Sequence, residues 1–398
     1  MTRETVDILV VGGGIAGLVA TAAFVRAGFA TMMVDPAPPL PVDATQSDQR
    51  STAFLRPARD LFRHIGIWDQ IAPHATPLDA LRIIDLAGNP PELRGERVFR
   101  GAEMGDEPFG WNFLNRIILH DLIAALKDIP QARLRYGTGF RAITTRTDGA
   151  IVTLDDGTRI TARMVIGADG RNSPLREAVG IGVNTTRYGQ KSLAFQVTHD
   201  LAHENTSSEI YHEGGPFTMV PMPDIDGSPA SAIVWMNRGA KANALLRLDA
   251  DAFNAEMLTR TAGLFGNLRL ISPRAIWPII TQRADQLIAE RVALIAEAAH
   301  VLPPIGAQGL NTSLNDIAEL LRLAEARPGA LGSPEMLDAY ARKRMPDITA
   351  RLRAIDVFNR ITRGENPALQ SLRLTGLRVI HDVAPLRRGL MRAGMQPL

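Results

Sequence analysis

The first 35 residues switch from the apolar pattern of a strand to that of a helix and back again. Residues 6–11 are mostly β-branched and apolar, which is typical of a strand covered on both faces in a parallel sheet. Residues 15–27 place apolar side chains at helical spacing and stop at Gly28, a residue that favours helix C-termini. A second short strand over 30–34 ends in Asp35. This order predicts a βαβ unit at the start of the chain.

The pattern continues to mix helices and strands up to about residue 184. It predicts a helix over 53–71, a strand over 81–86 followed by a Gly/Pro-rich loop, a helix over 117–126 and a buried strand over 164–168. Asp-Gly pairs at 148–149 and 156–157 separate strand-like runs. Because Asp-Gly favours the tight turns of hairpins, residues 139–162 are predicted to form a β-meander.

Residues 185–280 are the best candidate for a second, sheet-based domain. Strand-like runs cover 192–198, 217–221 and 231–237, with a helical stretch over 251–265. A last buried strand over 291–296 leads through a Pro/Gly loop into a helix from about Gly309 to Ala326, and the rest is helical and Arg-rich. The predicted fold is an α/β domain (1–75, 100–184 and 281–345) with an inserted, mainly antiparallel sheet domain (76–99 and 185–280) and a C-terminal helical region (346–398).

Composition narrows the chemistry. The 398 residues include no cysteine, which excludes disulfides, thiolate metal sites and redox-active Cys pairs, so any electron chemistry must belong to a cofactor. Lys and Arg number 44 against 42 Asp and Glu, which gives no global case for nucleic-acid binding. The sequence suggests no metal site. No run of eighteen residues is both apolar and uncharged, so we expect a cytoplasmic protein that does not span the membrane.

A glycine-rich turn follows the first strand. Gly12, Gly14 and Gly17 form a GxGxxG motif between strand and helix, with Asp35 closing the next strand. The first glycine permits the turn, the second lets a pyrophosphate approach the helix N-terminus, and the third allows close helix–strand packing. Asp35 is placed to accept hydrogen bonds from an adenosine ribose. The motif predicts a dinucleotide site against the alternative of a structural turn, and it leaves FAD and NAD both open.

Two further segments favour FAD. Residues 165–173 place Asp169 and Gly170 after a buried strand. Residues 296–311 run from a strand end with Glu297, through Pro303 and Pro304, into a helix that begins in a glycine-rich turn. With the first motif, these segments give three nucleotide-binding signals in order.

At these residues the chain resembles the single-component flavoprotein aromatic hydroxylases of the p-hydroxybenzoate hydroxylase fold, and most closely their ubiquinone-biosynthesis branch. The likeness covers nearly the whole chain and includes residues 48–50, 188–190 and 215–216 with Pro221. It implies a Rossmann-like FAD-binding domain with an inserted substrate-binding β-sheet domain and C-terminal helices.

The resemblance also implies the site. It assigns the ADP half of FAD to the first motif, the pyrophosphate and ribityl chain to two arginines and three further residues, the pyrimidine edge to the last loop, and the active-site wall to a proline. These residues are, in that order, Gly12, Gly14, Ile15, Ala16, Gly17 and Asp35; Arg50, Arg116, Asp169, Gly170 and Glu297; Gly306, Gln308, Gly309, Leu310 and Asn311; and Pro304. Ala296-Glu297 departs from the family's usual Gly-Asp, and a strand at this position would tolerate the alanine.

Several residues have a plainer interpretation. Arg50 and Arg116 are equally well explained as solvated surface side chains. His300 is better explained by hydrogen bonds to the loop backbone than by a general-base role. Aromatic-type side chains of the sheet domain are candidates for a ring pocket, although plain core is the commoner fate: Phe195, Tyr211, His212, Phe217 and Trp235. The Arg-rich stretch 369–394 suits either a packed terminal helix or a membrane-surface helix.

The implied reaction is hydroxylation of the aromatic ring of a polyprenylated phenol. NAD(P)H binds transiently and reduces the flavin, and O2 then forms a hydroperoxide at flavin C4a that hydroxylates the ring. The predicted partners are an aromatic or prenylphenol substrate and O2, without nucleic acid. Peripheral association with the inner membrane surface, a multi-enzyme assembly and a homodimer are compatible with the sequence. The rivals are a prenyl-chain flavin reductase of the same fold and a degenerate flavin-fold subunit that presents lipid.

Overall fold

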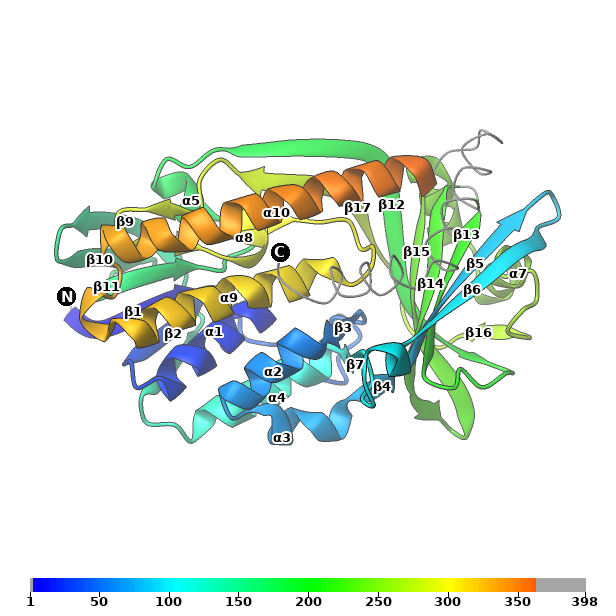
Figure 1. Cartoon of the computed structure of the whole chain (residues 1–398), viewed down its shortest axis with the longest axis horizontal. Helices are drawn as coiled ribbons and strands as arrows, with labels where there is room; N and C mark the ends of the chain where they lie inside the picture. Colours follow the sequence, from blue (N-terminus) through cyan, green and yellow to red (C-terminus); the bar gives the residue numbers. More distant parts are fainter. Residues whose placement is uncertain (1–2, 213, 363–398) are drawn as a thin grey trace.

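The computed structural model describes residues 3–212 and 214–362. The molecule is elongated, with an α/β half at one end and a large β-sheet at the other, and the long helix α10 (Pro334–Thr362) runs beside both (Figure 1). The predicted division into a nucleotide-binding half and a sheet half is therefore visible in the architecture. The exact domain boundaries remain a prediction.

A mostly parallel sheet forms the centre of the α/β half. Its strand order is β18 (Ile288–Ala289), β19 (Val292–Leu294), β11 (Arg159–Gly167), β1 (Arg3–Val11), β2 (Thr31–Asp35) and β8 (Ala132–Tyr136), with β9 (Phe140–Arg146) and β10 (Gly149–Leu154) added as a meander beside β11. Ile8, Leu9 and Val10 are completely buried, as the apolar run predicted. The predicted βαβ unit and meander are confirmed.

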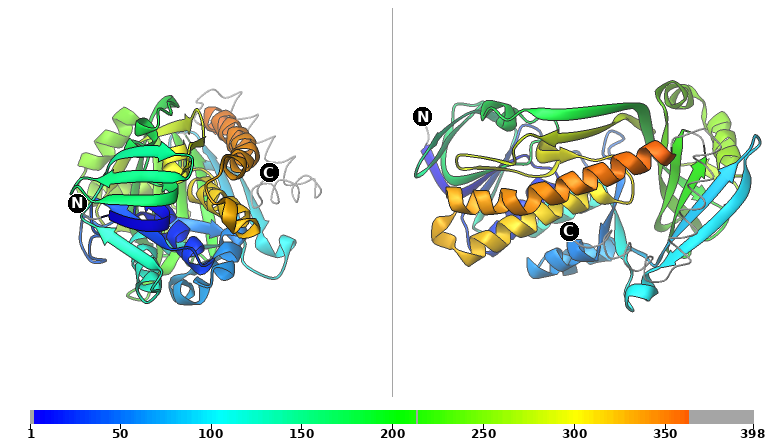
Figure 2. Two further views of the ribbon diagram at one scale, coloured as in Figure 1. Left: turned by 90° about the vertical axis from the view of Figure 1, so that its left-hand side faces the viewer. Right: turned by 45° about the horizontal axis from the view of Figure 1, so that its top comes forward.

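Helices cover this sheet. The helix α1 (Ile15–Arg26) packs against α4 (Asn115–Lys127) and α9 (Gln308–Ala326), and α9 packs against α10. Both views of Figure 2 show α9 and α10 side by side along the molecule. The short helices α5 (Pro174–Ala178) and α8 (Ala296–Ala299) lie close to strand ends. Ile305, three residues before α9, packs with Met236 and Ile279 of the large β-sheet, so α9 begins between the two halves.

The large sheet is mainly antiparallel, as predicted. Its order is β20 (His300–Val301), β17 (Ala275–Ala284), β12 (Val183–His199), β15 (Ser228–Arg238), β14 (Gly215–Ile225), β13 (Thr206–His212), β5 (Ala80–Ala87) and β6 (Glu92–Arg100), with β16 (Leu268–Leu270) beside β12. Phe195, Phe217 and Trp235 pack with Phe253 of α7 (Ala250–Arg260) and with α6 (Gly239–Arg247). These three aromatic residues are therefore core, and the pocket alternative is wrong for them.

A third, small sheet corrects two expectations. It joins β3 (Ser51–Leu55), β7 (Gly110–Leu114) and β4 (Thr76–Leu78). The helix expected over 53–71 therefore starts late and divides into α2 (Arg56–His64) and α3 (Trp68–Ile71), because residues 51–55 pair with β7. The stretch expected to be a loop after β5 contains β6, which pairs with β5. Short 3-10 turns complete the described elements: η1 (Ala72–His74), η2 (Gly101–Met104) and η3 (Pro328–Ala330).

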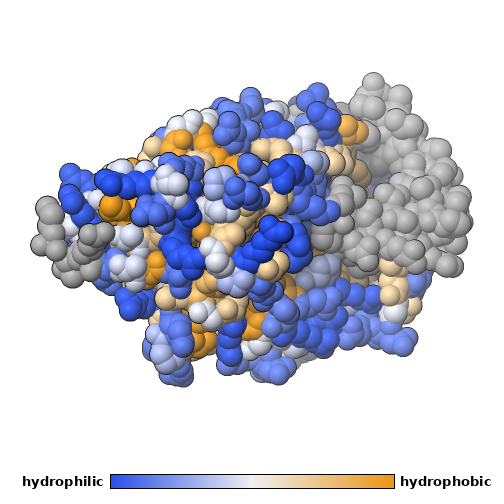
Figure 3. Space-filling model, turned by 60° about the vertical axis from the view of Figure 1, so that its left-hand side comes forward, coloured by the Kyte–Doolittle hydropathy of each residue, from blue (hydrophilic) through white to orange (hydrophobic). Residues whose placement is uncertain are grey.

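The surface shown in Figure 3 mixes hydrophilic side chains with small, scattered apolar patches. Among the helices of residues 3–362 that the structure describes, none is long and apolar enough to cross a membrane. The Arg-rich stretch 369–394 lies outside the described residues.

Candidate functional site

Three neighbouring parallel strands end at one edge of the central sheet. Val11 of β1 is in register with Gly167 of β11, and Gly167 is in register with Leu294 of β19. The residues that follow these ends are Gly12, Ala168 and Ile295, so the three segments singled out in the sequence leave the sheet side by side. Ligands of open α/β sheets bind at the carboxyl ends of the strands.

At two of the three glycines in this turn, any larger residue would clash with the backbone. A Cβ on Gly12 would lie 2.3 Å from the Ala168 carbonyl oxygen, and a Cβ on Gly17 would lie 1.9 Å from the Gly12 oxygen. A Cβ on Gly14 would meet no atom within 4 Å. Gly14 is the N-cap of α1 and has no capping side chain, so free N–H groups of the first turn face open space. This open cradle suits a pyrophosphate.

The carboxylate of Asp35 is held beside this turn. Gly13 N–H donates to Asp35 Oδ2 at 2.7 Å, and Ala37 N–H donates to Oδ1 at 2.9 Å. Two hydrogen bonds leave further lone pairs on the carboxylate. The assignment of Asp35 to a ribose remains a prediction that this geometry permits.

Tyr136 is a candidate that the sequence reasoning missed. It ends β8 in register with Asp35, and its ring lies beside Gly13, where a Cβ would come within 3.0 Å of Tyr136 Cε1. Its hydroxyl is buried without a hydrogen-bond partner among the described residues. Burial, and to a lesser extent the charge of Asp35, raises the pKa of Tyr136 to about 12. A protonated hydroxyl without a partner at this place fits a donor to the adenosine end of a nucleotide. The sequence signal that could have identified Tyr136 was a tyrosine at the end of the strand that pairs with β2.

Asp169 is already engaged by its own segment. Ser173 Oγ donates to Asp169 Oδ1 at 2.5 Å, and Leu175 N–H donates to Oδ2 at 3.0 Å, which fixes the start of α5. Burial raises the pKa of Asp169 despite these hydrogen bonds. Gly170 follows with φ of 83°. Asp169 shapes the turn, and its predicted place near the pyrophosphate is untested.

Arg50 is tied to two groups at the site. Its guanidinium donates to Asp48 at 2.7 Å and lies over the Trp277 ring, 5.4 Å from the ring centroid. The hydrogen bond to Asp48 raises the pKa of Arg50, and the charges of Asp48 and Glu297 add to this rise. Arg50 and Glu297, predicted to flank one ligand, are therefore close enough to interact electrostatically.

Arg116 borders a cavity of about 340 Å³ between the two halves. Arg116 Nη1 donates to Gln49 Oε1 at 3.1 Å, and Gln196 of β12 donates to the Gln49 backbone oxygen at 3.0 Å. Burial lowers the pKa of Arg116. The rest of the lining is largely apolar or uncharged: Val42, Asp43, Ala44, Thr45, Ile225, Ile271, Ser272 and Pro273. Arg116 is therefore better described as lining a cavity than as a solvated surface side chain.

The Ala296-Glu297 segment is not the strand end that the sequence suggested. The strand β19 stops at Leu294, and Ala296 begins the short helix α8 with φ of 54°. This left-handed conformation favours glycine, so the expectation that an alanine is easily tolerated here is wrong. Glu297 is carried on α8 rather than on a strand.

His300 also differs from expectation. Its Nε2 lies 2.6 Å from Oδ2 of Asp316, and both side chains are completely buried. Burial alone would raise the pKa of Asp316, but the charges of His300 and Arg344 hold it below its usual value. Nε2 of His300 is therefore paired with a carboxylate from α9 and not with the loop backbone, while its Nδ1 is buried without a hydrogen-bond partner among the described residues.

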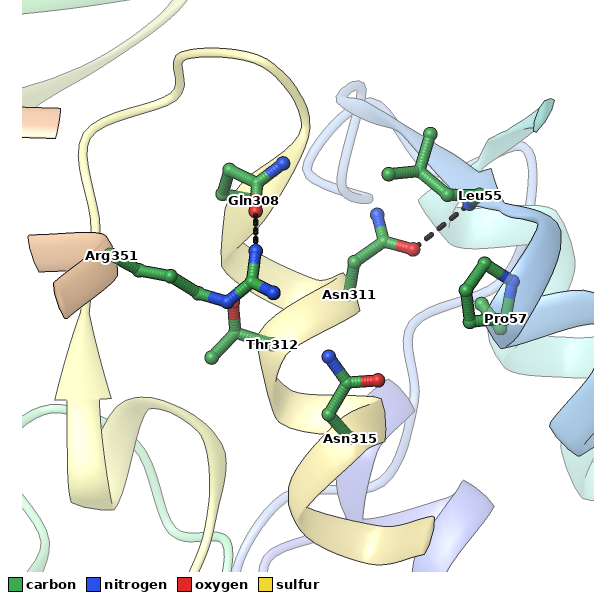
Figure 4. Close-up of a pocket in the computed structure, with 8 residues that line it drawn as sticks. Leu55, Pro57, Gln308, Asn311, Thr312, Asn315 and Arg351 are labelled. Atoms are coloured by element: carbon green, nitrogen blue, oxygen red, sulfur yellow. Dashed lines mark hydrogen bonds between the residues drawn. The ribbon is translucent and has the colours of Figure 1, made fainter. Parts of the chain in front are cut away.

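Side chains tie the first turn of α9 to neighbouring elements (Figure 4). Asn311 accepts from Leu55 N–H at 2.9 Å and donates to the Ala53 oxygen at 2.8 Å, which joins α9 to β3. Gln308 Oε1 accepts from Arg351 at 2.6 Å. A small cavity of about 10 Å³, room for one water, lies among these residues. The side chains of Gly309 and Leu310 cannot form hydrogen bonds. The role predicted for this turn is therefore one that its backbone N–H groups would perform.

Pro304 lies in the loop before α9. Its neighbour Ile305 packs with Met236 and Ile279 of the large sheet and with Ile355 of α10. The loop therefore rests on the large sheet, at the junction of the two halves. The predicted place of Pro304 on an active-site wall is consistent with this position and is not tested by it.

Comparison with known proteins decides the family. Residues 5–354 match the family model described as FAD binding domain. The chain is 32% identical over 398 aligned residues to ubiquinone hydroxylase UbiL of Rhodospirillum rubrum, across 99% of this chain and 90% of that protein. This chain belongs to the FAD-binding family.

Two further members of the comparison agree. The 3-demethoxyubiquinol 3-hydroxylase of Escherichia coli is 26% identical, with 98% of this chain and 99% of that protein covered. The crystal structure of p-nitrophenol 4-monooxygenase from Pseudomonas putida superposes with a TM-score of 0.79 at 17% identity, covering 99% of this chain and 100% of that one. At that identity the structural likeness supports the fold.

For this member of the FAD-binding family the cofactor is FAD. Three observations fit it: an open cradle at Gly14, a Tyr136 hydroxyl beside Asp35 with no hydrogen-bond partner among the described residues, and an α9 N-terminus without a side-chain cap in the same part of the chain. In the described part of the chain, no group of three or more His, Asp or Glu side chains is arranged to hold a metal ion.

Proposed function

We propose that this protein is an FAD-dependent monooxygenase that hydroxylates the aromatic ring of a polyprenylated phenol in ubiquinone biosynthesis, with NAD(P)H and O2 as co-substrates. The observation that carries the proposal is the match over 90% of the length of a ubiquinone hydroxylase, with the nucleotide motifs in the order that the family uses. The match to the Escherichia coli ring hydroxylase adds support.

We assign the ADP half of FAD to the Gly12–Gly17 turn, Asp35 and Tyr136, and the ribityl region to Arg50, Arg116 and Glu297. When bound, FAD supplies chemistry that side chains lack: it takes two electrons from NAD(P)H and uses them to activate O2. The protein's part is to bind, orient and exclude water. The N-terminus of α9 contributes free N–H groups and a positive dipole end, which favour the negative charge of a reduced ring.

The face of the large sheet opposite the α6–α7 core supports an apolar substrate. Met222, Ala230 and Ala232 form a buried cluster there with Leu114 and Ile225, and Ile225 also lines the 340 Å³ cavity. Val42 and Ile271 line the same cavity and are 37% and 41% exposed. We propose that the prenyl tail enters between these residues. Dimerisation, membrane-surface association and assembly with other enzymes remain predictions.

The decisive experiment combines cofactor, oxygen and product. The purified protein should show an oxidised-flavin spectrum, consume NADH or NADPH and O2 with a short-chain prenylphenol, and place isotopically labelled oxygen on the ring by mass spectrometry. Reduction of a prenyl double bond without O2 uptake would establish the reductase instead. A colourless protein that does not bind added FAD would favour the lipid-presenting subunit.

A further inference from the structure

Tyr188, Gly189 and Gln190, which belong to the likeness with the flavoprotein hydroxylases, form a bulge in β12. Arg187 pairs with Ile280 of β17 and Lys191 with Pro278, so the residues between them on β12 outnumber those on β17. Within the bulge, the glycine has a left-handed φ of 71°. Bulges re-aim the side chains of a strand.

The bulge binds the C-terminal part of α10. Tyr188 Oη donates to Asp356 Oδ1 at 2.7 Å and lies 2.7 Å from Thr281 Oγ1 of β17. Burial raises the pKa of Tyr188, which keeps its hydroxyl protonated as a donor. Asn359 Nδ2 donates to Gln190 Oε1 at 3.2 Å, and Asn359 is completely buried. Because a buried polar group is costly to leave without a partner, these contacts fix where α10 meets the large sheet.

The N-terminal part of α10 is tied to the α/β half. Tyr340 Oη donates to the Leu294 carbonyl oxygen at 2.8 Å, at the end of β19. Arg344 pairs with Asp316 of α9 at 2.8 Å, and Arg351 donates to the side chain of the first residue of α9 at 2.6 Å. The three α10 residues are spaced by four and seven positions, so they share one face of the helix.

One helix therefore contacts both halves of the molecule. Figure 1 shows α10 running from the α/β half to β12 and β17. Between its two sets of polar contacts, Ile355 packs with Ile305 of the loop before α9 and with Met236 and Ile279 of the large sheet. A helix with internal hydrogen bonds keeps its length, and the stretch from Tyr340 to Asp356 spans roughly 24 Å. A rigid element tied at both ends fixes the separation of the parts that it joins.

This separation matters for the proposed reaction. In productive turnover, two electrons and a proton from NAD(P)H and solvent let O2 place one oxygen atom on the ring, and the other oxygen leaves as water. If the ring is out of place, the same electrons and two protons convert O2 to H2O2 and the ring is unchanged. A misplacement of about 1 Å can slow a positioned step about 100-fold.

We infer that α10 acts as a brace between the large sheet and the α/β half, and that Tyr188 with Asp356 closes this brace, so that the substrate ring is held in reach of the flavin. The inference rests on the proposed function. Tyr188 and Asp356 are positioning residues, since they act through α10. Their loss uncouples NAD(P)H and O2 consumption from ring hydroxylation.

The test compares variants that open the brace with variants that keep it closed. Tyr188→Phe removes the hydroxyl and keeps the ring. Asp356→Leu removes the acceptor, whereas Asp356→Asn keeps an acceptor oxygen. Thr281→Val is the matched control, because Thr281 contacts the same hydroxyl from β17 and not from α10. For each holoenzyme, the hydroxylated product, the NAD(P)H consumed and the H2O2 released are measured with the short-chain prenylphenol.

We expect Tyr188→Phe and Asp356→Leu to form about threefold less product per NAD(P)H, with H2O2 accounting for the difference. The change in the flavin absorption spectrum on substrate binding should shrink in both, while FAD affinity stays at the wild-type value. Asp356→Asn and Thr281→Val should keep wild-type coupling. The double variant Tyr188→Phe/Asp356→Leu should be no worse than the more affected single variant, since both changes remove one hydrogen bond.

Wild-type coupling in folded Tyr188→Phe and Asp356→Leu would overturn the brace while leaving ring hydroxylation established. An equal loss of coupling in Thr281→Val would also overturn it, because the hydroxyl would then act through β17. If Asp356→Leu does not fold, Tyr188→Phe decides in the same assays. A wild-type protein that binds no FAD, or that hydroxylates no ring, would instead refute the proposed function, and the brace with it.

Discussion

The two ends of the proposed flavin site are built in different ways. The adenine end is a local turn in which Gly12 and Gly17 are within five residues of each other and their hydrogens fill the only space available. The flavin end, Ala296 to Asn311, is held by Asp316, Arg344 and Arg351 from two long helices, by β3 and by the large sheet, against which Ile305 packs. The comparison shows that a site can be fixed by short-range sterics at one end and by long-range charge pairing at the other.

The strongest test of this comparison removes a charge from the flavin end. Asp316→Asn leaves Arg344 and His300 buried beside a neutral group, and breaking a buried ion pair in this way costs about 4 kcal/mol. Chemical denaturation at neutral pH should show this loss. The more distant Asp338→Asn, on the outer part of α10, serves as a control and should change stability little.

The same residue predicts a pH dependence. Because the pKa of Asp316 is lowered in the folded protein, its contribution is present above the unfolded value of about 4 and is lost as the pH falls through the folded pKa. The stability gap between wild type and Asp316→Asn should therefore narrow in acid. A gap that is constant down to low pH would contradict the charge-pairing account of the flavin end.

The matching test at the adenine end adds one methyl group. Gly17→Ala would place a Cβ 1.9 Å from the Gly12 oxygen, and such overpacking costs about 3 kcal/mol. We expect lower stability and loss of FAD binding. Gly14→Ala should change stability by about 1 kcal/mol or less, because its Cβ meets open space, yet it should weaken FAD binding at least tenfold. Equal effects of the two variants on denaturation would refute the steric assignment.

A smaller effect sharpens the view of the flavin end. Ala296→Gly relieves a left-handed alanine and should stabilise the fold by about 0.5–1 kcal/mol, less than the full relief because glycine gains freedom in the unfolded chain. Ala299→Gly, in the same short helix, should destabilise it by about 1 kcal/mol. Thermal denaturation distinguishes the two, and a loss of stability in Ala296→Gly would mean that the alanine is not strained.

The smallest expected effect returns to the adenine end. Tyr136→Phe removes a buried hydroxyl that has no partner among the described residues, so stability should be unchanged or slightly higher. If the hydroxyl donates to the nucleotide, FAD should bind about fivefold more weakly, as expected for one lost hydrogen bond of about 1 kcal/mol. Because the pKa of Tyr136 is about 12, this difference should not vary between pH 6 and 9. Unchanged affinity would remove Tyr136 from the site.

Much of the fold was accessible from the sequence, because its signals are local. The run 6–11, the Gly12–Gly17 turn and the Asp-Gly hairpins each depend on neighbours within a few residues, and all appear as predicted. The errors fall where a distant partner decides. Residues 51–55 became a strand because β7 pairs with them, and residues 92–100 became β6 because β5 does.

The sequence by itself determined the nucleotide motif, the order of the segments and the resemblance that led to a flavin-dependent hydroxylase. Only the tertiary structure decided that His300 pairs with Asp316, that Ala296 is left-handed, that Tyr136 lies beside Asp35, and that Arg351 of α10 reaches Gln308 at the start of α9. The reason is physical: a turn is selected by the sterics of adjacent residues, whereas a buried ion pair exists only after elements far apart in the chain have packed together and excluded water.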